Sequence, residues 1–445
     1  MDKRVLTGWL AGGLILGASL AQAAESDTDR LLNLLIDKKV VTNEDAAGFR
    51  ADMAIKKQDE PQPPIISAGK EGFSIKSADG DFQLRFRGLV NLDARVFKET
   101  NDRSPGYDQF ILRRARGFFE GTLFRYFDFR VMQEFGQAKA ELFDAYVDIT
   151  CFPEAKLKLG RFTTPVGLTF IQNDPDGNFV ERSLVVNLLP FRDLGVQLHG
   201  DLLGGTVSYA LGVFNGSPDN GNSDGDSNNG KDVDGRIFMQ PFSQSAIEPL
   251  KGLGFGVSAT VGDSKGNATS SLPASFKTQI QEKFFSYRAG VAANGRRHRI
   301  SPQAYYYWNS LGVLGEYAST SQEISLNGKE ARINNDAWQV TVSYILTGEK
   351  NAFKGGITPQ NPWGAWEIAG RFARLNIDQE VFPTYADATT SAHKVTEYTL
   401  GVTWYPLKNI RFMLNYGQAL FEGGNVNTAD RNDEKLVLSR FQLLF

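Results

Sequence analysis

The chain has 445 residues, with 48 lysine or arginine and 51 aspartate or glutamate side chains, so its formal net charge is −3. This balance does not predict a nucleic acid or another polyanion as partner, and any preference for anions must come from the local placement of basic side chains. Cys151 is the only cysteine, which excludes a disulfide within the chain. His199, His298 and His393 have no partners at metal-ligand spacing, so no metal is expected, and no motif implies another cofactor.

Residues 1–23 are predicted to be a secretory signal peptide. Lys3 and Arg4 precede an apolar run from Val5 to Leu20, and residues 21–23 (Ala-Gln-Ala) have the small side chains of a cleavage site. The run is too short and too rich in glycine to span a membrane, and no later segment reaches about eighteen uninterrupted apolar residues. We therefore expect an exported protein whose mature chain has no transmembrane helix.

Residues 24–66 are predicted to form a periplasmic helical segment and a proline-rich linker. Thr42 and Asp45 have the spacing of a capping box that starts the second of two helices. Two short helices cannot bury an apolar stripe alone, so a coiled-coil-like association with copies of the segment is expected, although a leader that packs on nothing would show the same pattern. Prolines between Glu60 and Pro64 end the helix. The stripe consists of Leu31, Leu34, Leu35, Ala46, Phe49 and Met53.

Residues 67–445 are predicted to form one β-barrel domain, and the first strand shows why. Apolar and polar side chains follow a period of two over residues 82–97. A soluble strand also alternates, but its mean length is about five or six residues, and this strand is longer and highly charged on its polar face. Lipid on one side and water on the other fits better. The apolar face holds Phe82, Leu84, Phe86, Val90, Leu92, Ala94 and Val96; the polar face holds Gln83, Arg85, Arg87, Asn91, Asp93 and Arg95.

The same pattern recurs to the C-terminus and predicts about sixteen strands, an even number as in bacterial outer-membrane barrels. The expected fold class is all-β, a 16-stranded antiparallel transmembrane β-barrel. A further segment with a similar pattern, residues 277–288, is excluded because it would make the count odd. The strands after the first are expected at residues 110–124, 127–135, 141–149, 157–162, 193–203, 206–215, 233–242, 252–262, 297–308, 312–324, 336–346, 364–377, 394–405, 409–421 and 435–445.

The connections between these strands alternate in length, as expected when short turns face the periplasm and long loops face outward. Residues 347–363 are an exception, since they are long where a short turn is due. Between Gly160 and Asp193 about thirty residues lack regular structure, which is uncommon in a compact domain. Inside a barrel this segment can fold into the lumen as a constriction loop, with Arg161, Arg182 and Arg192 as its basic groups.

Two further features fit an outer-membrane wall. Aromatic residues gather toward the strand ends, where amphipathic rings suit the headgroup boundary. The chain ends on Phe445, with Phe441 and Leu443 on the same face, which matches the terminal strand of outer-membrane proteins.

Arginines are the main candidates for a site in the lumen of a barrel wide enough for water. A guanidinium group can bind two phosphate oxygens in a bidentate manner, and it stays charged at all relevant pH values. An arginine-lined constriction would therefore favour phosphate-like anions. The other interpretation is that these arginines balance Asp93, Glu120, Glu134, Asp144 and Asp148 across a wet lumen. Which face of its strand, lumen or lipid, Arg87 and Arg113 each occupy stays open. The candidate arginines are Arg85, Arg87, Arg113, Arg114, Arg116, Arg161 and Arg236.

Other motifs carry weaker signals. The acidic loop 219–234 does not fit an EF-hand, because Asn229 stands where glycine is needed if Asp224 comes first; a solvated loop is expected, and cation binding stays open. The basic run at residues 295–299 has two interpretations. It attracts anions or lipopolysaccharide phosphates at the pore mouth, or it is a solvated loop end. No nucleophile elbow and no phosphate-cradling Gly-Lys-Ser/Thr loop is present, so no catalytic residues and no enzyme activity are expected.

Together these motifs resemble the phosphate-selective porins O and P of the bacterial outer membrane. The most specific pieces are LKLGRFTTPVG and YILTGE followed by GAWE. Members of that family often carry an N-terminal helical segment and a long connection after YILTGE. The resemblance runs over nearly the whole mature chain, through FILRRARGFFEG, LKLGRFTTPVG, FVERSLVVN, DLGVQL, YILTGE, GAWEIAGRF, YTLGVTWY and the terminal strand.

The resemblance implies a homotrimeric 16-stranded porin in the outer membrane, among its lipid and lipopolysaccharide, with arginines at a central anion site. By motif position it implies that Arg113 and Arg114 are the paired arginines of the second strand, Arg161 the GRF arginine, Asp144 an acidic constriction residue and Arg236 a ladder arginine. The first strand departs from the family pattern, because Leu89 follows Gly88 where selective members have an arginine.

We therefore predict an outer-membrane porin that passes small anions, phosphate or polyphosphate, by passive diffusion past Arg113, Arg114 and Arg161. The alternative is a general or organic-solute porin with weak ion selectivity, which Leu89 and the near-neutral charge favour. An outer-membrane enzyme such as a lipase barrel would instead show hydrolysis that is lost on mutating a serine or histidine. A surface adhesin would show no conductance.

Overall fold

The structure is a computed structural model that describes residues 27–59, 63–69, 72–99, 107–222, 229–265, 272, 275–426 and 429–445. The predicted signal peptide, residues 1–23, lies outside these ranges. The chain divides into two compact units, Met1–Pro63 and Pro64–Phe445. Within the described residues, every helix is too short or too polar to cross a membrane.

The first unit contains α1 (Asp27–Asp37) and α2 (Asn43–Asp59). The predicted capping box is present: the backbone N–H of Asp45 donates to Thr42 Oγ1 at 3.2 Å, and the backbone N–H of Thr42 donates to Asp45 Oδ2 at 3.3 Å. Ala46 is buried between the helices, but much of the predicted apolar stripe is uncovered within this unit. The stripe residues that stay exposed are Leu31, Leu34, Phe49 and Met53.

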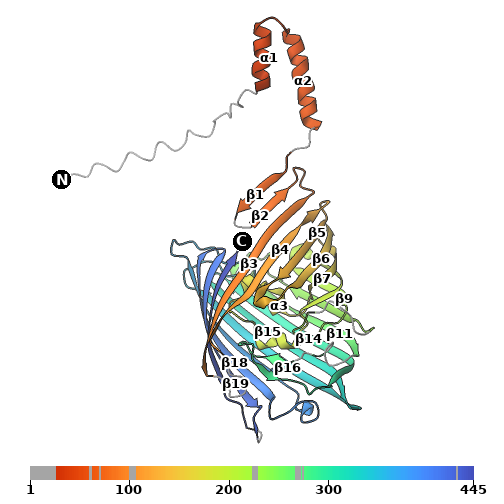
Figure 1. The fold of residues 1–445 in the computed structure, drawn as a ribbon, viewed down its shortest axis with the longest axis vertical. Helices are drawn as coiled ribbons and strands as arrows, with labels where there is room; N and C mark the ends of the chain where they lie inside the picture. The colour runs from red at the N-terminus through yellow and green to blue at the C-terminus, as the bar shows by residue number, and fades with distance from the viewer. Residues whose placement is uncertain are drawn as a thin grey trace, which may run out of the picture. The chain divides into compact units, whose positions relative to one another are not determined.

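The second unit is a β-barrel. Among the described residues, sixteen wall strands each pair antiparallel with their neighbours, and β20 pairs with β3 to close the ring (Figure 1). The predicted architecture is confirmed, and each of the sixteen predicted segments overlaps one wall strand. The wall strands are β3 (Gln83–Glu99), β4 (Gln109–Leu123), β5 (Phe127–Glu134), β6 (Glu141–Phe152), β7 (Ala155–Thr163), β8 (Arg192–Leu202), β9 (Val207–Phe214), β10 (Asp232–Met239), β11 (Leu253–Lys265), β14 (Ala292–Trp308), β15 (Leu311–Leu326), β16 (Lys329–Ile345), β17 (Ala365–Asn376), β18 (Ala392–Leu407), β19 (Ile410–Gly423) and β20 (Glu434–Leu444).

A hairpin of β1 (Ile65–Gly69) and β2 (Gly72–Lys76) extends the sheet along the first residues of β3. Beside it, the barrel closes tightly at the C-terminus. The backbone N–H of Gly88 donates to the carbonyl of Phe445 at 2.7 Å, and the N–H of Phe445 donates to the carbonyl of Gly88 at 2.9 Å. A Cβ atom on Gly88 would lie 2.2 Å from the Phe445 ring. The terminal aromatic residue can therefore cover the closure only because residue 88 is glycine.

Lipid-facing and lumen-facing side chains alternate on the wall as predicted. On β3, Asn91 and Asp93 are fully buried, whereas Leu92 between them is 46% exposed. This is the pattern of a strand with water and polar contacts inside the barrel and hydrocarbon outside.

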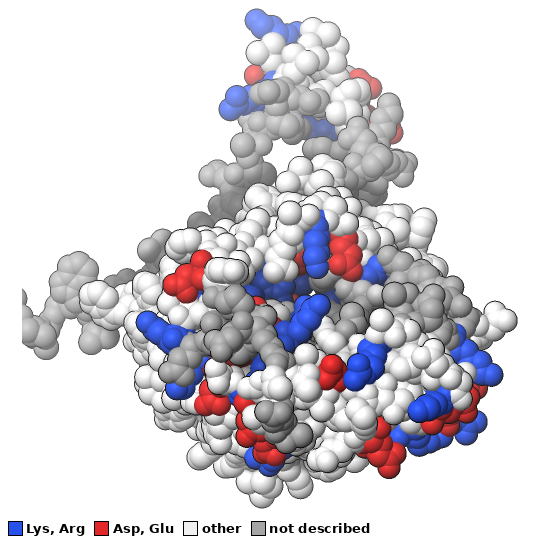
Figure 2. Space-filling view, turned by 60° about the horizontal axis from the view of Figure 1, so that its bottom comes forward, with Lys and Arg blue, Asp and Glu red and all other residues white. Residues whose placement is uncertain are grey.

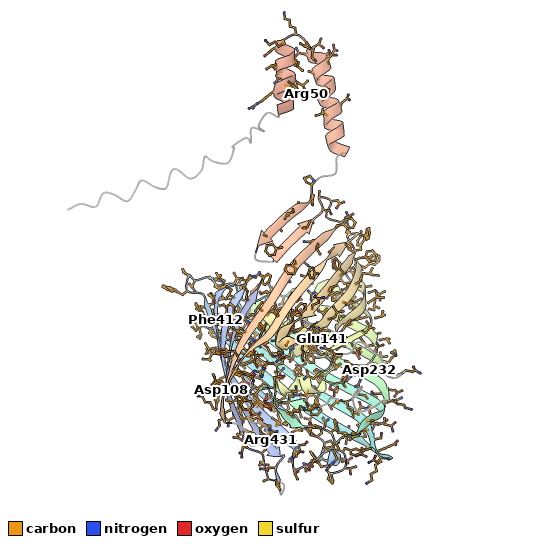
Figure 3. All side chains as sticks on the ribbon, in the orientation of Figure 1. Arg50, Asp108, Glu141, Asp232, Phe412 and Arg431 are labelled. Atoms are coloured by element: carbon orange, nitrogen blue, oxygen red, sulfur yellow. The ribbon has the colours of Figure 1, made fainter. Side chains whose placement is uncertain are left out.

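Aromatic residues cover the outer wall near the short-turn end of β17, β18 and β19. Trp404 stacks on both Trp366 and Phe412, with ring centroids 5.9 Å and 5.4 Å apart. Figure 3 shows Phe412 and Arg431 toward opposite ends of the barrel. The aromatic group therefore marks one membrane boundary, on the side that faces the periplasm in outer-membrane barrels.

Three loops from the long-loop end fold into the lumen. The constriction loop, residues 164–191, connects β7 to β8, as predicted. Residues 275–291 form the second inward loop, so the excluded segment 277–288 is indeed not a wall strand. Residues 377–391 form the third. Their short elements are α3 (Leu168–Ile171), η2 (Asp174–Asp176) and η3 (Leu184–Leu188) in the first, β12 (Phe276–Lys277) and β13 (Lys283–Phe285) in the second, and η6 (Gln379–Val381) in the third; η1 (Gly136–Ala138), η4 (Leu203–Gly205) and η5 (Glu248–Leu250) lie in other connections.

The inward loops build a hydrophobic core inside the barrel. Apolar side chains of η3, such as Val185 and Leu188, pack with Phe276 and Phe284 of the second inward loop and with Val381 of the third. The wall adds both small and large apolar residues to this core. The small ones include Ala337, Ala373, Ala392 and Ala419, and the large ones Ile324, Ile333, Leu375, Val395 and Phe421.

The long connection between β16 and β17 folds inward from the short-turn end. The Phe353 ring stacks on the Tyr305 ring of β14 at a centroid distance of 5.0 Å. Gln172 Nε2 of the constriction loop donates to the Phe353 carbonyl at 3.1 Å, and the Gly355 N–H donates to Asp176 Oδ1 at 3.3 Å. This connection is long because it meets the constriction loop inside the lumen, which explains the exception in the turn pattern.

Candidate functional site

The constriction loop is fixed across the lumen by a buried carboxylate on β15. Glu316 accepts hydrogen bonds from the backbone N–H groups of Leu168 and Thr169 at 2.5 Å and 3.2 Å and from Thr169 Oγ1 at 2.5 Å. Gln339 on β16 donates to the same carboxylate at 3.2 Å. The first N–H groups of a helix have no partner within it, so a carboxylate beside them satisfies them. The position of α3 therefore depends on Glu316.

Asp174, in η2 of the constriction loop, gathers three guanidinium groups. Arg114 Nη2 and Arg182 Nη2 lie 3.3 Å and 2.5 Å from Asp174 Oδ1, and Arg116 Nη1 contacts Asp174 Oδ2. Burial alone would raise the pKa of the Asp174 carboxyl, but the charges of Arg114, Arg182 and Arg116 outweigh burial and hold that pKa well below its usual range. The carboxylate is therefore ionised and neutralises much of the charge around it. Arg116 has a second acidic partner, Glu134 on β5, at 2.7 Å.

Glu181, farther along the same loop, forms a second centre. Arg113 binds it with two parallel bonds, from Nε to Oε1 at 2.7 Å and from Nη2 to Oε2 at 3.1 Å. Arg95 Nη2 donates to Oε1 at 3.2 Å. Burial would raise the pKa of Glu181, but Arg113 above all holds it far below its usual range. Arg440 Nη2 lies farther away, 4.0 Å from Glu181 Oε1. We call Asp174, Glu181 and the five nearer arginines, Arg95, Arg113, Arg114, Arg116 and Arg182, the constriction network.

A β-bulge explains how two adjacent arginines both reach the lumen. The register between β3 and β4 shifts at this point: Asn91 pairs with Arg114 and Leu92 pairs with Leu112, which leaves Arg113 as the extra residue. Such bulges re-aim a side chain that strict alternation would point to the other face. Arg113 therefore contacts Glu181 in the lumen rather than lipid.

Arg85 and Arg87 share one acidic partner on the neighbouring strand. Their guanidinium groups lie 3.7 Å and 3.3 Å from Glu120 Oε1 on β4. Arg130 on β5 holds the other oxygen of that carboxylate at 2.7 Å. Arg87 therefore faces the lumen.

Asp144 and Arg161 are paired with residues outside the constriction network. Asp144 accepts a hydrogen bond from Arg192 Nε at 2.7 Å. Arg161 is 3% exposed, and its Nη2 lies 3.3 Å from Glu141 Oε1. The structure thus brings Arg113, Arg114 and Arg116 together, whereas Arg161 contacts a different acid.

A cavity of about 330 Å³, here called the turn-side cavity, lies between the constriction loop, the wall and the β18–β19 turn. Seven basic residues line it against three acidic ones. Even if Glu120 and Glu134, which pair with lining arginines, are added to the acids, the basic groups exceed them by two. The basic residues are Arg87, Arg116, Arg130, Arg182, Arg192, Lys408 and Arg411; the acidic ones are Asp144, Asp174 and Asp176.

Arg411 on β19 is a main source of this excess. Its guanidinium group donates to the carbonyls of Gly177 and Asp174 at 2.9 Å and 3.3 Å and to Gln442 Oε1 at 3.1 Å. These three acceptors are neutral, so they orient the side chain without cancelling its charge.

A second cavity, of about 380 Å³, continues the basic surface along β6 to β10. Arg236 on β10 lies on its lining, donates to Gln303 Oε1 at 3.3 Å and places its guanidinium carbon 4.5 Å from the Phe238 ring centre. Lys354, from the long β16–β17 connection, lies on the same lining, and burial followed by the nearby Arg236 charge lowers the pKa of its amino group. Neither Arg161 nor Arg113 lines either of these cavities.

The long-loop end of the barrel carries charges of both signs, with basic side chains also visible in the hollow at its centre (Figure 2). The basic run 295–299 is not simply a solvated loop end, because Arg297 and Arg299 lie on β14, are buried and pair with Asp232 at 2.8 Å and 3.0 Å. Asp219 pairs with Arg299 at 2.6 Å. The described parts of the acidic loop 219–234 thus bind arginines, and no group of three or more metal-binding side chains occurs in the described ranges.

The chain matches a family model described as phosphate-selective porin O and P over residues 82–445, which is most of its length. The chain belongs to this family. It is therefore an outer-membrane porin, a channel and not an enzyme.

Solved porins share the fold at low sequence identity. The outer membrane channel DcaP of Acinetobacter baumannii is 11% identical, with a TM-score of 0.54 over 85% of this chain and 100% of that one. The anion-selective porin from Comamonas acidovorans is 11% identical, with a TM-score of 0.52 over 82% and 100%. The trimer form of OmpT from Vibrio cholerae is 10% identical, with a TM-score of 0.51 over 82% and 99%. At these identities the likeness concerns the barrel alone.

Sequence reasoning missed several lumen residues of this porin. Asp174 and Glu181 gave no signal, because their partners lie on distant strands. Arg411 could have been found by parity, since Phe412 and Leu414 beside it are exposed to lipid and strict alternation then turns Arg411 inward. The same holds for Arg440 on β20, which binds Asp93 on β3 through two bonds of 2.6 Å and 2.7 Å.

Proposed function

We propose that this porin passes small anions, phosphate and polyphosphate among them, across the outer membrane by passive diffusion. The turn-side cavity supports the proposal most directly, because its basic groups outnumber the acidic ones and Arg411 contacts neutral acceptors. Basic groups in a cavity with low-dielectric walls raise the local concentration of anions. Several neighbouring groups of similar strength let an ion move on without becoming trapped.

The predicted arginines take two roles in this proposal. Arg113, Arg114 and Arg116 hold the constriction loop in place through Glu181 and Asp174, so they shape the narrow part of the path. Arg87 and Arg236, with Lys354 and Arg411, line the two cavities and supply the steps along which an anion moves. Asp144 orients Arg192, and Arg161 acts outside the cavities.

A general or organic-solute porin with weak ion selectivity is the second candidate. Pairing of Arg113, Arg114 and Arg116 with carboxylates supports it, because paired charges attract anions less. Leu89 supports it too, since a fully buried leucine occupies the lumen side of β3 beside Arg116.

The reversal potential of the purified full-length protein in a planar bilayer, under a potassium chloride gradient, separates the two candidates. We expect a preference for chloride that falls by about twofold or more in the double variant Arg411→Gln, Lys408→Gln, because two cavity charges are lost. Arg332→Gln removes the same kind of charge from an exposed site beside Glu323 and serves as the matched control. Cation preference of the unmodified protein would contradict anion transport. An unchanged permeability ratio in the double variant would contradict the role given to these two cavity charges.

Block of the chloride current by inorganic phosphate then tests the narrower claim. For a phosphate pathway, we expect phosphate to half-block the current at a lower concentration than sulfate does. In the double variant, the half-blocking concentration of phosphate should be higher than in the unmodified protein. Equal weak block by both ions would leave a porin for small anions in general.

We further propose that the porin is a homotrimer whose residues 1–23 are removed as a signal peptide, 24–66 form a periplasmic helical segment and 67–445 form the barrel. The uncovered apolar stripe on α1 and α2 and the existence of a trimer form of OmpT support this. Native mass spectrometry of the detergent-extracted protein should give three times the mass of the mature chain. A monomer would contradict the trimer, and an N-terminus other than residue 24 would contradict the cleavage site.

A further inference from the structure

The turn-side cavity contains apolar surface as well as charge. Leu89 and Met132, two of its lining residues, are 0% and 2% exposed, and each lies opposite a residue of β4 that also lines the cavity. Leu89 is registered opposite Arg116, and Met132 opposite Phe118. An apolar side chain therefore lies next to a guanidinium group on the same face of the wall.

The constriction loop adds aromatic faces covered by cations. The rings of Phe170 and Phe191 stack at a centroid distance of 4.3 Å and an angle of 16°. The Arg182 guanidinium carbon lies 4.9 Å from the Phe191 centre, and that of Arg192 lies 4.1 Å from it. All four residues line the cavity. Stacked guanidinium groups keep their in-plane N–H groups available for hydrogen bonds at the ring edges.

Three buried donors on this lining lack a partner among the described residues: Nε of Arg87, Nη1 of Arg192 and Nε of Arg411. Arg192 and Arg411 are 5% and 4% exposed. A buried guanidinium N–H without an acceptor is costly, so an acceptor from a solute would satisfy it.

We propose that the turn-side cavity binds organic carboxylates that carry an apolar body, in preference to inorganic phosphate. The carboxylate accepts hydrogen bonds from the guanidinium groups of Arg192 and Arg411, and the apolar body packs on Leu89, Met132 and the aromatic rings. A hydrated phosphate ion gains nothing from these apolar walls, because they cannot replace the water it loses. The volume of about 330 Å³ lies at the lower end of the range for small-molecule sites.

This inference rests on the proposed function, since it names the class of anion that the cavity selects. Its test is the block of chloride current through the full-length protein in a planar bilayer by sodium benzoate, sodium acetate and inorganic phosphate. We expect benzoate to reach half-block at a concentration about tenfold lower than either acetate or phosphate, because benzoate combines the carboxylate with a buried ring. Half-block by phosphate or acetate at the same or a lower concentration than benzoate would overturn the inference.

Two variants locate the apolar contact. Leu89→Asn and Met132→Gln each keep nearly the size of the side chain but make it polar, and each should raise the half-blocking concentration of benzoate about tenfold while leaving acetate unchanged. Leu203→Asn makes the same change in the 77% exposed turn residue Leu203 and should leave all three blocks unchanged. If benzoate block survives in both cavity variants, the apolar contact is wrong. If Leu89→Asn does not insert, Met132→Gln gives the same decision.

The reversal potential in potassium chloride alone, with no organic anion present, keeps the two claims apart. Anion preference together with equal block by benzoate and acetate overturns only the organic-carboxylate site. Loss of anion preference in the unmodified protein overturns the proposed function itself.

Discussion

Asp174 at the centre of the constriction network and Arg411 on the turn-side cavity show two opposite uses of arginine. Around Asp174, three guanidinium groups meet one carboxylate that the loop carries into the lumen. On the turn-side cavity, Arg411 reaches only neutral oxygens in its side-chain hydrogen bonds among the described residues. The number of arginines in a lumen therefore does not predict its electrostatic potential. The potential also depends on whether the loop that crosses the lumen carries acidic side chains.

Removing the central acid should break the network most strongly. In Asp174→Ala, Arg114, Arg116 and Arg182 lose their shared counter-charge while buried, which should destabilise the protein by about 3–5 kcal/mol. The folded fraction should show a higher ratio of anion to cation permeability, because the network then resembles the cavity. Thermal unfolding in detergent and reversal potentials measure the two effects. Asp176→Ala, which removes a neighbouring carboxylate bonded to Gly355, is the control with a smaller expected effect.

Releasing the constriction loop should have the next largest effect. Glu316→Ala removes the acceptor of both N–H groups at the start of α3, and bonds to a charged group contribute about 1.5–3 kcal/mol each. We expect a larger and noisier single-channel conductance. Glu316→Gln keeps one side-chain oxygen as an acceptor, so its conductance should lie between those of the unmodified protein and Glu316→Ala. An unchanged conductance in Glu316→Ala would mean that the loop does not narrow the path.

The wall of this porin could be predicted from the sequence, because lipid on one side and water on the other impose a period of two on every strand. Asn91, Leu92 and Asp93 show the rule in three consecutive residues. The exclusion of residues 277–288 from the wall was right for a physical reason as well. The adjacent Phe284 and Phe285 are both buried, which suits a core inside the barrel and not a boundary between lipid and water.

The constriction network could not be predicted in the same way. Arg113 and Glu181 are 68 residues apart and Arg116 and Asp174 are 58 apart, so no local pattern connects them. The bulge at Arg113 breaks the alternation that located the other arginines. Arg411 obeys that alternation and was within reach of it, whereas the inward fold of the β16–β17 connection depends on a partner, the constriction loop, that is itself irregular.

A further positive charge on the lining of the turn-side cavity should increase anion selectivity. Leu89→Arg restores the arginine that the family resemblance implies at this position and places it next to Arg116. We expect the ratio of anion to cation permeability to rise by about twofold to threefold, with stronger block by phosphate. Leu89→Met changes the shape without the charge and should leave the ratio unchanged. An unaltered ratio in Leu89→Arg would place the main barrier elsewhere along the path.

A partly exposed arginine should matter much less. The Arg85 side chain is 44% exposed and lies 3.7 Å from Glu120, which Arg87 and Arg130 also hold. Exposed ion pairs contribute about 0–1 kcal/mol and are screened by salt, so Arg85→Ala should change neither thermal stability nor selectivity by much. Arg130→Ala, which removes two bonds of 2.7 Å and 2.9 Å to the same carboxylate, is the contrasting variant with a larger expected loss. Equal losses in both would mean that Glu120 is not shared in this way.

Acid should change the network least of all. Asp174 and Glu181 have pKa values held below their usual ranges of about 3.8 and 4.5, so both stay ionised in the folded protein when free carboxyl groups take up protons. A depressed pKa gives stability that is fully present above the unfolded value and is lost only as the pH falls through the lower folded value. Ion selectivity and the unfolding temperature should therefore show no step from these two groups between about pH 8 and about pH 5, and stability should decline only below about pH 4. A step in selectivity near neutral pH that disappears in Asp174→Asn would show that this carboxyl is not held by its three arginines.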